Sequence, residues 1–351
     1  MKQNGFTLVE VMISLFIGGL ILGGVMFTFI SMKVTTKDTM AIGELQESGR
    51  LAINIMQRDI EQVGFWGTYY DDSFTAVNTT VSSLVPTEDG ESIDCFEGVN
   101  NGSFPDLTSS SNFRTIYAKT TISKDNLNCI NDGIIPPNNK ETDILQLKFL
   151  QGNLQYVPTY NNDTITYENK TTENDNRTAY FFVAEQEQAK FVTGAYLPTN
   201  DNVTIWPYTH HVYYIKEEKY LVNNKEIKVP ALRRKRLVNG KMTSETIMEG
   251  VENMRFLFGL DTNNDSRVDT YKSASTITAA EWENRKGMLT VQVFLLIRAL
   301  QPDPGIKLKN QKYILGEGSV KRELNFNDNY RRTVFTTTIR LSNVGGNLWR
   351  I

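Results

Sequence analysis

Hydrophobic residues dominate the first part of the chain almost without interruption. Residues 6–32 contain no proline and a single charged residue, Glu10. A helix rises about 1.5 Å per residue, so this run is long enough to cross a bilayer core of about 30 Å. The pattern therefore predicts one membrane-spanning helix over residues 6–32.

In residues 33–64 the pattern becomes striped, because apolar positions recur at intervals of three and four on one face of a continuing helix. The stripe consists of Ile42, Leu45, Gly49, Ala52, Met56, Ile60 and Val63. We expect this amphipathic arm to pack on a folded domain. Gly64 and Gly67 are expected to end the helix. Phe65 and Trp66 are expected to be buried where the chain leaves it.

Residues 65–351 combine polar stretches with β-branched and aromatic runs that are typical of strands. The predicted strands are residues 144–150, 179–184, 210–215, 254–260, 288–300 and 332–341. A short helix is predicted over residues 277–285, with Thr278 as its N-cap. Strands that follow one long helix predict an α+β fold, in which the helix packs on an antiparallel β-sheet. We assign residues 65–351 to one loop-rich globular domain.

Two polar stretches interrupt the strands, and the first contains both cysteines of the chain. Residues 69–140 are predicted to form a loop-rich excursion, and residues 160–180 an exposed loop or ribbon. Cys95 and Cys129 lack the Cys/His spacing of a zinc site. In an oxidising compartment a disulfide between them is favoured over two unpaired thiols. It would close a loop of about 35 residues and stabilise the fold by roughly 3–4 kcal/mol.

Composition excludes several classes of function. The formal net charge is only −3, which argues against a broad surface for nucleic acid or another polyanion. The chain contains no nucleophile elbow, phosphate-binding loop or paired histidine and carboxylate motif. We therefore expect a protein that is not an enzyme.

Three interpretations of the N-terminal run compete. A secretory signal peptide has a shorter apolar core and a small-residue cleavage site, both of which are missing here. A plain membrane anchor explains the length but not Glu10, because a carboxylate within a bilayer costs at least a few kcal/mol unless it is paired. The segment GFTLVE at residues 5–10 resembles the processing site of type IV prepilins and pseudopilins. This resemblance implies a leader at residues 1–5, cleavage after Gly5 by a prepilin peptidase, and N-methylation of the new terminus at Phe6.

The resemblance also gives Glu10 a role. When such helices pack side by side in a filament, the amino group of Phe6 in one subunit can meet the carboxylate of Glu10 in its neighbour. Pairing offsets part of the desolvation cost, and a wrong register leaves a charge uncompensated. We expect Glu10 to act on register and recruitment, whereas the alternative places its carboxylate unpaired among the lipid headgroups.

Two further segments narrow the resemblance to one family. The arm, LQESGRLAINIMQRDIEQVGFWG at residues 45–67, and the late portion at residues 253–341 both resemble PilW minor pilins. The resemblance implies a non-catalytic minor pilin that helps to initiate or assemble a type IV pilus, at or near its tip. Its implied partners are other minor pilins, the major pilin, the prepilin peptidase and the inner-membrane assembly machinery.

Localisation and alternatives follow from the same resemblance. The chain would cross the inner membrane once, with its globular domain in the periplasm, before it moves into a pilus on the cell surface. A minor pseudopilin of a type II secretion system is the first alternative, because the N-terminal motif does not separate the two systems. A pilus-tip adhesin or DNA-capture subunit is the second.

A loop rich in aspartate and asparagine is the one candidate site for a cofactor. Residues Asp261, Asn263, Asp265 and Asp269 alternate in the segment DTNNDSRVD. Oxygen ligands at this spacing can surround calcium, and PilW-like minor pilins often carry a similar turn. The match to an EF-hand loop is imperfect, because Ser266 and Lys272 replace the expected glycine and glutamate. A solvated hairpin turn is the alternative.

Two polar clusters remain. His210 and His211 are adjacent, and neighbouring residues on a strand point to opposite faces, so we expect structural roles rather than one shared metal ion. The basic segment ALRRKRL at residues 231–237 could contact DNA or an acidic partner. The interpretation that we favour is a solvated strand edge, where basic side chains prevent aggregation.

Overall fold

The computed structural model describes residues 7–343, except for residues 72, 82–93, 135–139, 153–155, 162–163, 170–179, 194–202, 223, 239, 285–286 and 304–309. The chain divides into two compact units, residues 1–47 and residues 48–351. Helix α1 (Leu8–Glu61) begins in the first unit, and its last turns belong to the second.

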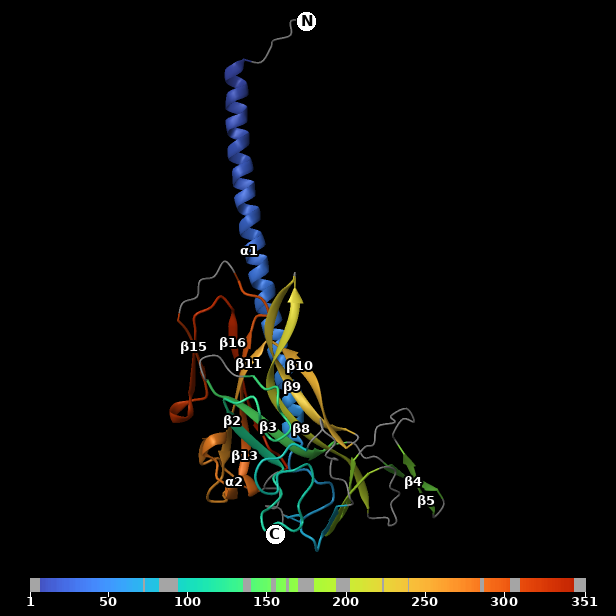
Figure 1. The fold of residues 1–351 in the computed structure, drawn as a ribbon. Helices are drawn as coiled ribbons and strands as arrows, with labels where there is room; N and C mark the ends of the chain where they lie inside the picture. The colour runs from blue at the N-terminus through green and yellow to red at the C-terminus, as the bar shows by residue number, and fades with distance from the viewer. Residues whose placement is uncertain are drawn as a thin grey trace. The chain divides into compact units, whose positions relative to one another are not determined.

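The long helix predicted from the sequence is confirmed as one continuous element (Figure 1). It ends just before Gly64 and Gly67, which have φ angles of 87° and 61°. Glycine adopts this left-handed conformation without a steric penalty, so Gly64 ends the helix as expected, whereas Gly67 lies in a separate turn after Glu61. Trp66 is 3% exposed, and Phe65 is half-buried against Trp206, with ring centroids 4.9 Å apart.

Eight strands form the larger, curled sheet of the second unit. Six of them lie in the order β1 (Thr79–Val81), β7 (Gln188–Thr193), β6 (Tyr180–Glu185), β8 (Thr204–Val222), β3 (Thr142–Leu150) and β2 (Ile116–Thr121). Strands β9 (Lys225–Val238) and β10 (Lys241–Glu249) continue from β8. All the pairs are antiparallel except β1 with β7.

A second sheet of four strands follows in the chain. Its order is β12 (Thr270–Ser273), β11 (Val251–Leu260), β13 (Met288–Arg298) and β16 (Arg332–Arg340). Two ribbons stand outside these sheets, β14 (Gln311–Leu315) with β15 (Arg322–Phe326), and β4 (Tyr156–Asn161) with β5 (Thr164–Asn169). Helix α2 (Ala279–Glu283) begins with the predicted Thr278 cap, which forms a reciprocal capping box with Glu281.

The six predicted strands are confirmed, and one of them is much longer than its hydrophobic run. Residues 210–215 belong to β8, which pairs with β6 over its first part, with β3 over its middle and with β9 over its remainder. A strand that changes partners along its length receives ladder hydrogen bonds beyond its apolar stretch. The polar excursion of residues 69–140 also contains two strands that the pattern did not predict, β1 and β2.

An aromatic cluster fills the core beside the end of α1. Trp66 packs edge-on against Phe74 and Phe182, with ring centroids 4.9 and 5.1 Å apart. Phe191 and Tyr208 extend the same cluster. Edge-to-face pairs add stabilisation beyond the burial of area alone. The chain that leaves the helix is therefore fixed against the larger sheet.

A buried ion pair connects the two sheets. Asp143 on β3 is fully buried and accepts hydrogen bonds from Arg322 Nη2 at 2.7 Å and from the backbone N–H of Phe256 at 2.8 Å. Phe256 belongs to β11, and Arg322 begins β15. One carboxylate therefore links a strand of each sheet to the β14–β15 ribbon. Because a buried charge needs a partner, this contact specifies how the sheets join.

The predicted disulfide is present. Cys95 and Cys129 are bonded, and the Cys95 side chain is completely buried. The bond closes residues 95–129 into a loop within the excursion that precedes β3. Of the two predicted states of the cysteines, a disulfide or two unpaired thiols, the structure has the disulfide.

Candidate assembly site

The first turn of α1 contains the predicted assembly residue, Glu10. Its Oε2 accepts hydrogen bonds from the backbone N–H of Thr7 at 3.2 Å and from Thr7 Oγ1 at 3.1 Å, and Thr7 Oγ1 accepts the N–H of Glu10. This reciprocal pair is a capping box, which satisfies donors that every helix start leaves unpaired. The predicted processing residues, Gly5 and Phe6, lie outside the described residues.

The capping role of Glu10 is a local function that our sequence reasoning missed. A signal was available, because threonine followed three residues later by glutamate is a recognised start of a helix. The carboxylate thus has one partner within its own chain. Pairing with the amino terminus of a neighbouring subunit stays a prediction.

The helix from Leu8 onward exposes nearly all of its apolar side chains. Leu15, Leu22 and Phe27 are 71%, 71% and 75% exposed, and the apolar stretch is long enough to cross a membrane. Gly18, Gly19, Gly23 and Gly24 have open space where a side chain would stand. A contiguous apolar surface of this kind marks a membrane or protein interface. No contact among the described residues explains these glycines, but close approach of a second helix would.

In the second unit the arm packs as the stripe predicts. Ala52, Met56, Ile60 and Val63 are completely buried, whereas Arg58 and Glu61 between them are exposed. Ile42, the first member of the predicted stripe, is 44% exposed, so the stripe begins later than the pattern indicated.

A buried polar cluster, which we call the Asp59 cluster, attaches the arm to the larger sheet. Asp59 Oδ2 lies 2.5 Å from His211 Nδ1 and accepts a hydrogen bond from the hydroxyl of Tyr213 at 2.6 Å. Arg234 Nη1 donates to the same oxygen at 3.4 Å. Its Nε donates to Glu245 Oε1 at 2.8 Å. Periodicity did not reveal Asp59, because its position lies one residue beside the apolar stripe.

Burial and hydrogen bonds together set the protonation states of Asp59 and His211 in this cluster. Burial alone would raise the pKa of Asp59, but the contacts with His211, Tyr213 and Arg234 hold that pKa below its ordinary value. Burial lowers the pKa of His211 in spite of the nearby carboxylate. A neutral imidazole that donates its Nδ1–H to an ionised Asp59 satisfies both shifts. The cluster therefore joins helix and sheet through a charge-assisted hydrogen bond.

The two histidines enter separate networks, as their strand positions predict. His210 is completely buried and lies with Nδ1 2.7 Å from Ser103 Oγ and Nε2 2.9 Å from Gln146 Nε2. His211 faces Asp59 on the other side of β8. Both roles are structural.

The basic cluster does not occupy a strand edge, so the interpretation that we favoured is wrong. Strand β9 pairs with β8 on one side and β10 on the other. Arg233 pairs with Glu218, Arg234 pairs with Glu245 at 2.7 Å, and Lys235 is only 8% exposed. Cross-strand carboxylates neutralise the arginines, which leaves little free charge for a polyanion.

The four predicted calcium ligands all lie in the loop that joins β11 to β12 or at its ends. Asp261 accepts the backbone N–H groups of Asp265 and Ser266, at 3.2 and 2.7 Å. Asp269 accepts the backbone N–H and the hydroxyl of Thr262, both at 2.7 Å, and these bonds lower its pKa. In the described part of the chain, no group of three or more His, Cys, Asp or Glu side chains is arranged to hold a metal ion. Calcium binding stays a prediction.

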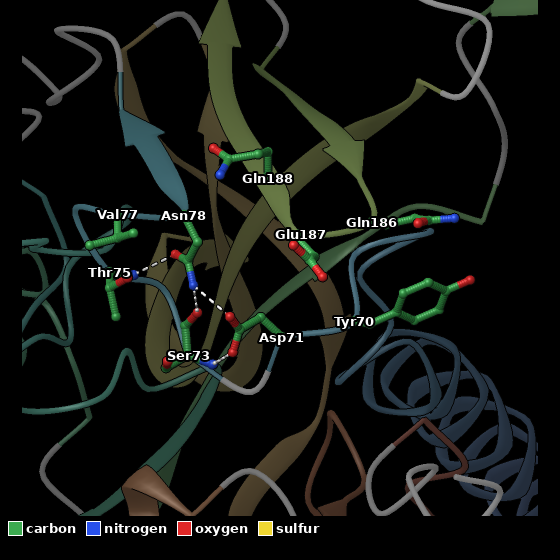
Figure 2. Close-up of a pocket in the computed structure, with 9 residues that line it drawn as sticks. All are labelled: Tyr70, Asp71, Ser73, Thr75, Val77, Asn78, Gln186, Glu187 and Gln188. Atoms are coloured by element: carbon green, nitrogen blue, oxygen red, sulfur yellow. Dashed lines mark hydrogen bonds between the residues drawn. The ribbon is translucent and has the colours of Figure 1, made fainter.

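A polar pocket of about 700 Å³ lies between the segment after α1 and the turn that joins β6 to β7 (Figure 2). Asn78 organises one wall, because it accepts the N–H of Thr75 and donates to Asp71 and to the Ser73 carbonyl. The N–H of Tyr70 donates to the Gln186 carbonyl and joins the two walls. These walls are more than a hundred residues apart in sequence, so no local motif indicates the pocket.

Comparison with known families agrees with this architecture. Residues 1–26 match the prokaryotic N-terminal methylation motif, and residues 212–343 match the family described as type IV pilus-assembly protein W. A methylation motif that leads into an exposed apolar helix, followed by a β-sheet domain, is the arrangement of a pilin-like protein. Together the two matches support a PilW-like type IV pilin. Among curated proteins and solved structures, none matches the chain.

The second match covers a continuous part of the fold. It runs from the middle of β8 to the residues just after β16, and it includes Tyr213 and Arg234 of the Asp59 cluster and the whole four-stranded sheet. The predicted resemblance of residues 253–341 lies inside the match. The arm at residues 45–67 lies outside it.

Proposed function

We propose that this chain is a minor pilin that takes part in initiating or assembling a type IV pilus, at or near the tip, without catalysing a reaction. The observation that carries the proposal is the apolar surface of α1, which side chains of its own chain leave uncovered in the described residues. Such a surface is stable only against lipid or other helices. The bilayer covers it before assembly, and neighbouring pilin helices cover it afterwards.

The second unit supports a scarce subunit rather than one repeated along a thin shaft. It consists of residues 48–351, with two sheets and two ribbons. A domain of this size fits a scarce subunit at a tip better than a subunit packed throughout a thin shaft. Its disulfide agrees with folding in the periplasm, an oxidising compartment, while the helix anchors the chain in the inner membrane.

The partners that we propose follow from the same helix. The prepilin peptidase would cut after Gly5 and methylate Phe6. The major pilin, other minor pilins and the inner-membrane assembly machinery would then receive the processed helix. Glu10 would select their register through the new amino terminus, because only the correct register pairs both charges.

Deletion of the gene tests the proposal directly. We expect a sharp loss of surface pili and of twitching motility, and recovery of both when the gene is supplied in trans. Immunogold labelling of complemented cells should place the chain at pilus ends. Uniform labelling along every pilus would contradict the tip assignment without affecting the pilin assignment.

A minor pseudopilin of a type II secretion system is the second candidate, because the methylation motif is common to both systems. The match to the pilus-assembly family favours the pilus. A deletion strain that keeps its pili but loses secretion of exoenzymes would reverse this choice. A strain that keeps its pili but no longer adheres or captures DNA would favour a tip adhesin or DNA-capture subunit instead.

A further inference from the structure

The four-stranded sheet ends at β16, and no other described strand pairs with the outer edge of β16. On its inner side the strand pairs with β13 from Arg332 to Arg340, in one register and without a bulge. An open edge carries a row of backbone N–H and C=O groups that can pair with another strand. The nine residues of β16 are therefore a straight template for an added strand.

The register shows which residues of β16 direct their backbone groups outward. The Leu341 N–H donates to the Leu289 carbonyl at 2.8 Å. At the other end of the pair, the Ala299 N–H donates to the Arg331 carbonyl, also at 2.8 Å. Opposite residues of an antiparallel pair alternate between hydrogen-bonded and non-hydrogen-bonded positions. The odd-numbered residues therefore bond to β13, and the even-numbered ones direct their N–H and C=O groups outward. The outward residues between the two terminal arginines are Val334, Thr336 and Thr338.

The other edges of the two sheets have features that prevent such pairing. Strands β12 and β1 are only four and three residues long. Strand β10 begins with the exposed Lys241 and has a bulge between Thr246 and Met248, and β2 contains Lys119. Short strands, lysines and bulges all block the addition of a strand. Strand β16 has no lysine, proline or bulge, and its exposed residues are threonines apart from Arg340.

The two faces of β16 determine which side chains an added strand needs. Phe335 packs against Gly49 in the arm of α1. On the opposite face, Val334 packs against the cluster that includes the β14–β15 ribbon, and Thr336 and Thr338 follow it, exposed. Side chains alternate between the faces of a strand. An added strand therefore fits when its side chains are apolar beside Phe335 and polar on the opposite face.

Charge favours a different chain over a second copy of this one. Arg332 is buried and paired with Glu252 and Asp328, so Arg340 is the one exposed charge of β16. The strand itself contains no aspartate or glutamate. Full-length antiparallel pairing of two β16 strands would place Arg340 opposite Arg332 and would offer neither a carboxylate. A strand with an acidic residue near Arg340 gains a cross-strand ion pair instead.

We propose that the outer edge of β16 receives an extended strand from a neighbouring pilin subunit, which continues the four-stranded sheet. The added strand forms backbone hydrogen bonds with Val334, Thr336 and Thr338 and places a carboxylate beside Arg340. Because Phe335 contacts the arm of α1, this edge lies beside the helix through which we propose that subunits join. The docking rests on the proposed function for the identity of the partner alone.

Photo-cross-linking in intact cells tests the docking, with a photoreactive amino acid at position 338 of the full-length chain. Mass spectrometry of the adduct should identify a segment of another protein with a prepilin-type N-terminus, and this segment should contain an aspartate or glutamate. A pseudopilin in the adduct would support the docking and contradict the pilus assignment. An adduct with residues 344–351 of the same chain, with a second, differently tagged copy, or with no protein would overturn the docking.

A proline at position 336 distinguishes backbone pairing from side-chain contact. Thr336→Pro removes an outward N–H, and proline is tolerated on the open side of an edge strand, so the domain should still fold. Thr336→Ala is the matched control, because it changes the side chain and keeps the N–H. We expect the adduct to fall about tenfold in Thr336→Pro and to stay within about twofold in Thr336→Ala. Equal yields in the two variants would overturn pairing through the backbone.

Charge reversal at position 340 provides a second reading that does not depend on the proline variant. Arg340 is exposed at the end of β16, so its replacement leaves the core unchanged. Arg340→Glu should lower the adduct about fivefold, because it repels the proposed carboxylate, and Arg340→Lys should keep it. If Thr336→Pro lowers the melting temperature of the purified protein, the arginine pair decides. An adduct of equal yield in Arg340→Glu and Arg340→Lys would then overturn the proposal.

Discussion

At position 49 the arm has no side chain, because an aromatic ring occupies the space. A Cβ atom on Gly49 would lie 2.3 Å from Cε2 of Phe335, which belongs to β16 of the four-stranded sheet. Real Cβ atoms do not approach that closely, so the ring would have to move. The glycine in the predicted stripe is therefore a packing position and not a flexible one.

We predict that Gly49→Ala lowers the free energy of unfolding. Displacing a packed ring costs about 1–3 kcal/mol, against about 1 kcal/mol gained by alanine in a helix. Gly43→Ala is the matched control, because a side chain at Gly43 would meet no described residue within 4 Å, so the alanine should stabilise the helix. Chemical unfolding of both variants in detergent measures the difference. In a Phe335→Ala background the ring is gone, so Gly49→Ala should lower the free energy of unfolding much less than it does in the wild type.

Protonation of His211 makes the free energy of unfolding depend on pH. Because its pKa is lowered in the folded protein, the unfolded chain binds a proton first as the pH falls below about 6.5. Stability from His211 is therefore complete above that pH and is lost as the pH falls toward the folded-state pKa. The slope from one such group is at most about 1.4 kcal/mol per pH unit.

We predict that His211→Gln is less stable than the wild type at pH 7.5 and loses stability less steeply between pH 6.5 and 5.5. Glutamine can still donate to Asp59 but does not titrate. The difference in slope between the two proteins isolates His211 from Asp94, Lys148 and His210. Unfolding curves at three pH values measure it, and parallel slopes would show that His211 keeps its ordinary pKa.

At the scale of elements, the β11–β12 loop can be stabilised in two ways. Its carboxylates accept backbone N–H groups within the loop, and this bonding alone forms a stable turn. The same oxygens could also surround calcium, as we propose from their spacing. The two explanations differ in whether stability depends on the ion.

If calcium binds, its addition should raise the melting temperature relative to the same protein in EDTA. Ligand at one hundred times its dissociation constant adds about 2.7 kcal/mol. Asp269→Asn should remove the increase, whereas Asp303→Asn, an ion-pair partner of Arg331 elsewhere, should not. Equal melting temperatures with calcium and with EDTA would assign the loop to the hydrogen-bonded turn alone.

The whole molecule depends on how α1 joins a filament, and Glu10 has two separable roles there. It caps its own helix, and we propose that it pairs with a neighbouring amino terminus. Glutamine can form the capping box but has no charge, whereas alanine neither forms the capping box nor has a charge. We predict that Glu10→Gln and Glu10→Ala both insert into the membrane and both fail to enter pili.

Fractionation of membranes and of sheared pili, with immunoblotting, measures the two steps. Glu10→Gln at wild-type level in the pilus fraction would assign Glu10 to the helix cap and remove the charge-pairing role. Thr7→Ala is the companion control, because it weakens the cap and leaves the carboxylate; it should still assemble.

The local sequence pattern was sufficient to predict the elements whose structure depends on one property of a few neighbouring residues. The apolar run, the stripe from Ala52 to Val63, the terminating Gly64 and six strands all follow from hydrophobicity and backbone freedom over a few residues. The disulfide also followed, because the chain has two cysteines and the predicted compartment is oxidising.

Pattern failed where the partner is distant in sequence. The basic segment resembles an edge, but β10 covers it, and strand neighbours are not encoded locally. In the sequence Asp59 is only a polar residue beside the stripe. Its partners His211, Tyr213 and Arg234 are more than a hundred residues away and meet it only in the fold. The polar pocket likewise needs walls from two separate segments.

The sequence by itself therefore determined the class of the protein, because a processing motif, a membrane-length helix and a stripe are contiguous signals. Only the tertiary structure decided what surrounds each charge. Lys148 is one basic residue in a strand by sequence, and its pairing with Asn101 appears only when the excursion folds over β3. Burial sets the chemistry of a titratable group, and burial is a property of the whole fold.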